Sequence, residues 1–167
     1  MIFRLSHKLA KKLKVPLPKS APTDPNPFAD WSGHLFTADR TQYLILINTP
    51  SLYSTVIYGK GISNDRQFLD RALVAIREFM VDDDNEFIFR RFIAPAAETI
   101  RFASALNRSV TGSMNDLVNA AHIWLTDGEL SPFDVGFKLN DMPMSYVGYK
   151  TPRDVFKTMK AEKHDDT

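Results

Sequence analysis

A chain of 167 residues, 44% of them hydrophobic and 25% charged, is long enough for one domain with a substantial core and too short for two. The formal net charge of +1 excludes a strong overall field that would attract polyanions. The sequence contains no cysteine, which excludes disulfides, thiolate metal sites and a cysteine nucleophile and is compatible with a reducing compartment.

The N-terminus carries basic residues but no apolar segment follows them, so the sequence predicts no signal peptide. No apolar run approaches the length that spans a membrane. We therefore expect a cytoplasmic protein of bacterial or phage type that makes no membrane contact.

The first segment, Met1–Leu5, is expected to form a short strand at an edge of a sheet. Ser6 then caps a predicted helix from His7 to about Lys14, with apolar residues on one face and lysines on the other. This possible basic patch consists of Lys8, Lys11, Lys12 and Lys14. A solvated helix surface is the simpler interpretation, because exposed charges need no special explanation. A patch that binds a phosphate backbone or an acidic partner is the functional alternative.

Residues 15–28 contain five prolines, at positions 16, 18, 22, 25 and 27. Proline removes a backbone donor and fixes φ, so this segment cannot be a helix interior or a central strand. We expect an extended loop that carries Phe28 and Trp31 onto the sheet.

Residues 31–58 predict three consecutive antiparallel strands separated by turn-forming residues. The middle segment, Tyr43–Ile47, is apolar without interruption. A strand with one wet face would alternate between apolar and polar residues, so this run indicates a strand that is covered on both faces.

Asn64 begins the most clearly periodic helix, whose apolar face recurs every three or four residues through Met80 and should cover the predicted central strand. The acidic run 82–86 lacks the glycine that a calcium loop requires at its sixth position. Its carboxylates fit the first turn of a second helix, which ends before Pro95. We expect no metal and no cofactor.

Residues 98–106 alternate and predict a fourth strand. Ser113, with Asp116 three residues later, resembles the cap of a helix that stops at 126–128. We expect a long loop over 129–144, with one short strand around 135–139, and then a last helix capped by Thr151 with Pro152 at its first position.

These elements predict one α+β domain over residues 1–160, followed by a frayed C-terminal tail over 161–167. The expected architecture is a small antiparallel sheet, a three-strand meander plus one or two further strands, covered by four or five helices.

Signatures of catalytic chemistry are weak. Ser113 and His122 lie nine positions apart and would point in opposite directions on a helix, so they cannot form a triad with Asp116. The four histidines show no metal-binding spacing. His34 is expected to bond to a backbone carbonyl at the edge of the sheet. Pairs of catalytic carboxylates leave no spacing signature, so this class stays open.

The segment 107–116 carries more polar groups than a simple turn needs. A strand-to-helix junction offers free backbone N–H groups and the positive end of a helix dipole. The candidate residues for binding a ligand or an anion are Asn107, Arg108, Ser109, Ser113 and Asn115. The simpler alternative is that these groups satisfy the local backbone through caps and turns.

Three segments carry a resemblance to a known family: I-F-R-L-S-H-K-L-A-K-K-L at 2–13, D-W-S-G-H-L-F at 30–36, and above all N-R-S-V-T-G-S-M-N-D at 107–116. The chain resembles an uncharacterised family of bacterial and phage proteins that is known only as a domain of unknown function. The similarity spans Met1 to Phe156, and the proline loop is longer than the family pattern. The resemblance implies a single domain and brings no activity, cofactor or partner.

The preferred hypothesis is a small binding or interaction module whose partner is nucleic acid or protein. The alternative is an enzyme that acts on a phosphate-bearing substrate at the 107–116 junction. A third hypothesis is a structural protomer that forms a homodimer through a sheet edge bearing Tyr53 or Tyr58. Both monomer and homodimer remain open.

Overall fold

The protein was analysed as a computed structural model, which describes residues 1–128 and 130–161. Five strands form one sheet: β1 (Ile2–Leu5), β2 (Asp30–Ala38), β3 (Thr41–Asn48), β4 (Ser54–Tyr58) and β5 (Arg101–Ala103). The described α-helices are α1 (His7–Lys12), α2 (Asp65–Asp82), α3 (Glu86–Ile88), α4 (Arg108–Thr126), α5 (Pro132–Leu139) and α6 (Pro152–Thr158). Short 3₁₀ turns lie at Pro27–Ala29, Ala96–Glu98 and Ser145–Val147, and a π-helical turn at Phe89–Ile93 continues α3.

The strand order is β4-β3-β2-β1-β5, and β2, β3 and β4 form the predicted antiparallel meander. The α+β class and the small helix-covered sheet are confirmed. The two further strands add a parallel part, since β1 pairs in parallel with both β2 and β5. The long connection from β1 to β2, through α1 and the proline loop, lets the chain return in the same direction.

The prediction that β1 lies at a sheet edge is wrong. The strand lies between β2 and β5, and all four of its residues are buried. The charged side chain of Arg4 is held inside the fold by an ion pair with Asp30. The predicted strand over 98–106 is confirmed only in its middle, where β5 covers the outer side of β1.

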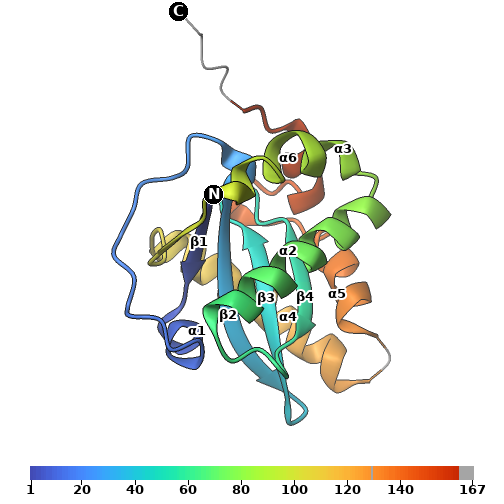
Figure 1. Ribbon diagram of the computed structural model, residues 1–167. Coiled ribbons are helices and arrows are strands. Elements are labelled where there is room, and N and C mark those ends of the chain that lie inside the picture. The colour runs from blue at the N-terminus through green and yellow to red at the C-terminus, as the bar shows by residue number, and fades with distance from the viewer. Residues whose placement is uncertain (129, 162–167) are drawn as a thin grey trace, which may run out of the picture.

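The doubly covered central strand is confirmed. Leu44 and Leu46 belong to the core beneath α2, whereas Ile45 and Ile47 belong to the core beneath α4 and α5. Figure 1 shows α2 crossing one face of the sheet, with α4 on the other face. The molecule therefore has three layers, with the sheet in the middle.

The start of α4 differs from the prediction. Asn107, not Ser113, is the cap: its backbone is extended, and its Oδ1 accepts a hydrogen bond of 2.9 Å from the backbone N–H of Val110. Ser113 is buried inside the helix. Gly112 obscured this start, because glycine weakens a helical pattern, yet it lies in the second turn with open space around it.

The predicted loop over 129–144, with a strand at 135–139, is also wrong. Ser131 caps α5 by accepting a hydrogen bond of 3.1 Å from the N–H of Asp134, and Pro132 takes the first helical position. Gly136 marks close packing, because an added Cβ would lie 2.7 Å from Cε2 of Phe79. Glu129 and residues 162–167, which hold most of the predicted frayed tail, lie outside the described residues.

The edge strand β4 is partly capped by a side chain that follows α5. Asn140 accepts a 2.8 Å hydrogen bond from the N–H of Ser54 and donates a 2.9 Å bond to its carbonyl. Tyr53 is buried, stacks on Phe156 with ring centroids 4.2 Å apart, and donates to Asp83 Oδ2 at 2.6 Å. A homodimer edge that bears Tyr53 is therefore excluded by its burial.

Candidate functional site

Three polar side chains lie on the same face of β2. Side chains alternate along a strand, so Asp30, Ser32 and His34 all face the α4 side, while Trp31 faces the α2 side. The three polar residues differ in how completely their hydrogen bonds are formed, and this difference separates structural from available groups.

The Arg4–Asp30 pair is fully hydrogen-bonded. Arg4 Nε lies 2.9 Å from Asp30 Oδ1 and Arg4 Nη2 lies 2.8 Å from Asp30 Oδ2, which is bidentate geometry. The remaining donors reach the carbonyls of Ala21, Pro22 and Ser104 at 2.9–3.2 Å. The pair therefore fastens the proline loop and the segment after β5 onto β1 and β2, and is a structural element.

Ser32 is satisfied as well, since its Oγ lies 2.8 Å from Oγ1 of Thr49. His34 is different. Its Nδ1 is buried and has no hydrogen-bond partner among the residues that the structure describes. A buried ring nitrogen that forms no bond weakens the fold, and it is the one such side-chain atom found in the described residues.

His34 lines a cavity of about 270 Å³ between the end of β1, the first half of β2, the start of α1 and the first two turns of α4. The apolar walls come mainly from Leu5, Val110 and Met114. Polar groups on the wall besides His34 include Ser6, His7, Thr111 and Asn115. A mostly apolar cavity with a few convergent polar groups is the usual form of a small-molecule site.

Electrostatics at this cavity favour a neutral histidine. Burial lowers the pKa of His34, and the positive charge of Lys8 lowers it further. A neutral imidazole offers one N–H donor and one acceptor nitrogen. The cavity wall contains no carboxylate among the described residues, so a bound anion would meet no negative side chain there.

The prediction that His34 bonds to a backbone carbonyl at the edge of the sheet is wrong in two respects. β2 is the central strand of the sheet, not an edge, and Nδ1 bonds to no described carbonyl. The sequence carries a signal for this face: Asp30, Ser32 and His34 are polar residues at alternate positions in the first half of the strand.

The five candidate residues of the 107–116 segment separate in the structure. Asn115 lines the His34 cavity, together with Thr111 one turn earlier. Asn107 caps α4, and Ser113 is buried with 8% of its surface exposed. Arg108 and Ser109 are exposed outside the cavity wall. The structure therefore brings one of these residues to His34 and places the other four elsewhere.

The four lysines of the possible basic patch differ in their contacts. Lys8, Lys11 and Lys14 are exposed. Lys12 donates to Oε1 of Gln42 and, at 3.2 Å, to the carbonyl of Gly59, so it ties α1 to the sheet.

Residues 1–128 and 130–161 contain no group of three or more histidine, aspartate or glutamate side chains placed to hold a metal ion. No helix within these ranges is both long enough and apolar enough to cross a membrane.

A family model described as "Domain of unknown function (DUF6933)" matches residues 2–155, nearly the whole chain. The chain belongs to the DUF6933 family. This membership places β1 through most of α6, including the His34 cavity, inside the family region. No curated protein matches the sequence.

A solved structure also matches the DUF6933 chain over most of its length. It is titled "CryoEM structure of simian T-cell lymphotropic virus intasome in complex with PP2A regulatory subunit B56 gamma". The match has 12% sequence identity and a TM-score of 0.47 and covers 94% of this chain, which spans 64% of the other. A likeness at this level carries no argument about function.

Proposed function

We propose that this DUF6933 domain is a binding module that holds a small organic anion in the His34 cavity. The observation that carries the proposal is the buried, unpartnered Nδ1 of His34, a residue that lines that cavity. If the imidazole turns so that this nitrogen faces the cavity, a bond to a ligand atom would remove the one unsatisfied buried side-chain group found in the described residues.

The size of the cavity limits the ligand. A volume of about 270 Å³ lies near the lower end of the range for small-molecule sites, so the ligand is a metabolite-sized molecule rather than a polymer. The apolar wall formed by Leu5, Val110 and Met114 would contact a short carbon skeleton. The hydroxyl and amide groups of Thr111 and Asn115 would contact its polar end.

The charge around the cavity supports an anion. Two turns at the N-terminal end of α4 line the cavity, and this end of a helix carries positive partial charge. The charge of Lys8 acts on His34 from α1, and Arg108 is the first residue of α4. A carboxylate or phosphate monoester group would meet this field favourably.

An enzyme that acts on a phosphate-bearing substrate is the weaker proposal. The wall offers His34 as a base, but it contains no described carboxylate that would orient the imidazole or act as a second acid. Binding needs only the groups that are present.

A nucleic-acid or protein partner is favoured by a different observation, the exposed Lys8, Lys11 and Lys14 on and beside α1. Binding of generic DNA or RNA through these lysines should weaken steeply as salt rises. Loss of this binding in a Lys8→Glu, Lys11→Glu double variant would support it, and absence of binding at low salt would exclude it.

The cavity proposal can be tested by thermal unfolding in the presence of small carboxylates and phosphate monoesters. A ligand that binds only the folded state stabilises it by RT ln(1 + L/Kd), where L is the ligand concentration, so Tm rises with the logarithm of that concentration once it exceeds Kd. We expect at least one compound to raise the Tm of the wild type. The rise should disappear in Asn115→Ala and His34→Leu.

The matched control is Asn119→Ala, because Asn119 is an exposed asparagine one turn further along α4 and outside the cavity wall. It should respond like the wild type. Failure of every compound, or an equal rise in His34→Leu, would overturn the proposal.

A further inference from the structure

The exposed face of α2 has an unusual arrangement of charges around an apolar centre. Val74 is 54% exposed, and Asp70, Arg71, Arg77 and Glu78 around it are exposed too. Figure 1 shows α2 as the outer layer on its side of the sheet. A single exposed valine is normal on a protein surface, so the inference rests on the pattern of the charges around it.

The charges form two pairs with the same spacing. Arg71 and Glu78 lie seven residues apart, as do Asp70 and Arg77, so each pair spans about two helical turns along one side of Val74. The two pairs run in opposite order along the chain, positive to negative in one and negative to positive in the other. The whole face contains two positive and two negative side chains.

This pattern is complementary to itself. If two copies of α2 pack antiparallel about a two-fold axis beside Val74, Arg71 of one copy lies opposite Glu78 of the other, and the reverse contact forms by symmetry. On the other flank, Asp70 lies opposite Arg77 in the same way. A uniformly acidic or basic partner would repel half of these charges.

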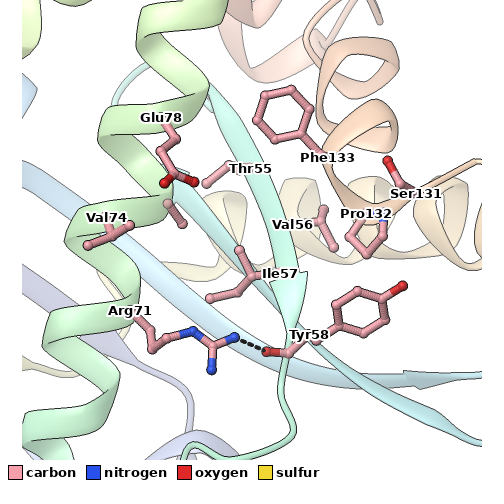
Figure 2. Close-up of a pocket in the computed structure, with 11 residues that line it drawn as sticks. Thr55, Val56, Ile57, Tyr58, Arg71, Val74, Glu78, Ser131, Pro132 and Phe133 are labelled. Atoms are coloured by element: carbon pink, nitrogen blue, oxygen red, sulfur yellow. Dashed lines mark hydrogen bonds between the residues drawn. The ribbon is translucent and has the colours of Figure 1, made fainter.

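The side of α2 that carries Arg71 and Glu78 borders a groove. Figure 2 shows Arg71 and Glu78 on α2 beside the groove, with β4 as its floor and Phe133 of α5 opposite. Val74 also borders the groove. Arg71 Nη2 lies 3.3 Å from the carbonyl oxygen of Tyr58. Neither Arg71 nor Glu78 forms an ion pair within residues 1–128 and 130–161, so both charges are available to a partner.

We propose that α2 is the interface of a homodimer, in which two copies of this chain pack antiparallel through Val74 and exchange the contacts Arg71–Glu78 and Asp70–Arg77. The interface lies on the opposite face of the sheet from the His34 cavity and is independent of ligand binding. One helix pair with its groove makes a small interface, so the dimer should form at roughly micromolar to millimolar concentration.

The test is sedimentation equilibrium of the full chain, with charge reversals at Arg71 and Glu78, the two positions that border the groove. The wild type should show a concentration-dependent dimer. Arg71→Glu places two glutamates opposite each other, and Glu78→Arg does the same with two arginines, so each variant alone should be monomeric under conditions in which the wild type is half dimer.

Two rescue experiments distinguish lost complementarity from a damaged fold. The double variant R71E/E78R reverses both partners and should dimerise again, with a Kd within about tenfold of the wild-type value. An equimolar mixture of R71E and E78R should form a heterodimer. Arg101→Glu, at an exposed arginine in the opposite edge strand β5, is the matched control and should dimerise like the wild type.

A wild-type chain that stays monomeric up to about 1 mM would overturn the proposal. A dimer that both single reversals leave unchanged would overturn it too, because the contact surface would lie elsewhere. Circular dichroism melts of all variants must show folded protein. A folded R71E/E78R double variant that remains monomeric while the wild type dimerises would also contradict the assigned contacts.

Discussion

The Arg4–Asp30 pair and His34 lie on the same face of neighbouring central strands, yet they are in opposite states. Arg4 has a partner for each of its side-chain nitrogens, and Asp30 also accepts from the N–H of Asp24 at 3.0 Å. His34 has a buried nitrogen with no described partner. The Arg4–Asp30 pair holds the proline loop, β1, β2 and the segment after β5 together, whereas His34 lines a cavity and has a ring nitrogen without a described partner.

The largest effect on stability is expected at the Arg4–Asp30 pair, whose hydrogen bonds are all formed. Arg4→Met removes one partner of a buried ion pair and leaves the Asp30 carboxylate without compensation, which should lower the free energy of unfolding by about 3–5 kcal/mol. Urea denaturation measures this loss.

The double variant R4M/D30L is the control, because replacing both partners removes the isolated charge and should recover most of the stability. A loss below about 1 kcal/mol in Arg4→Met would show that the pair is not structural.

A second saturated group, Asn140, should give an intermediate effect. Asn140→Ala leaves the buried N–H and carbonyl of Ser54 without their partners at the edge of β4. We expect a loss of about 1–3 kcal/mol in urea denaturation. The exposed Asn119→Ala should change stability by less than about 0.5 kcal/mol, and equal losses in the two variants would contradict the assignment.

Substitution of His34, whose Nδ1 has no described partner, should not lower the stability. His34→Leu removes no hydrogen bond at Nδ1 and replaces a buried polar atom with an apolar one, so stability should stay within about 0.5 kcal/mol of the wild type or rise. A loss of more than about 2 kcal/mol would show that His34 is a structural residue and would remove the contrast between the two places.

The smallest effect is a dependence of stability on pH. Burial and the charge of Lys8 lower the pKa of His34 below its ordinary value of 6.5. The unfolded chain then binds more protons than the folded one between the two pKa values, so the free energy of unfolding falls as pH drops through 6.5. Below the folded pKa the loss levels off. Urea titrations from pH 5 to pH 8 should show this loss in the wild type but not in His34→Leu.

The sequence predicts correctly those features of the fold that depend on the pattern of a single strand or helix. The unbroken apolar run at 43–47 predicted a strand covered on both faces, and the face of α2 predicted its packing. The sequence is misleading where a glycine interrupts the apolar pattern of a helix. Gly112 interrupted the pattern at the start of α4 and hid the cap at Asn107, and Gly136 suggested a loop where it only lets Phe79 approach.

The candidate site was only partly accessible from sequence because its parts lie far apart in the chain. Asn115 was selected from the segment 107–116, but its neighbour His34 comes from β2, and the two meet only when α4 packs on the sheet. The parallel return of β1 beside β2, which brings Ser6 and His7 to the same cavity, has no local sequence signal.

The most direct test of the central claim is an NMR titration of the His34 imidazole with inorganic phosphate as the probe, with sodium chloride at equal ionic strength as the control. A bound anion stabilises the protonated ring, so phosphate should raise the pKa of His34 and shift the amide signals of Thr111 and Asn115, but not that of Asn119. A His34 pKa that is identical in phosphate and in chloride, with unchanged amide signals around the cavity, would contradict the account.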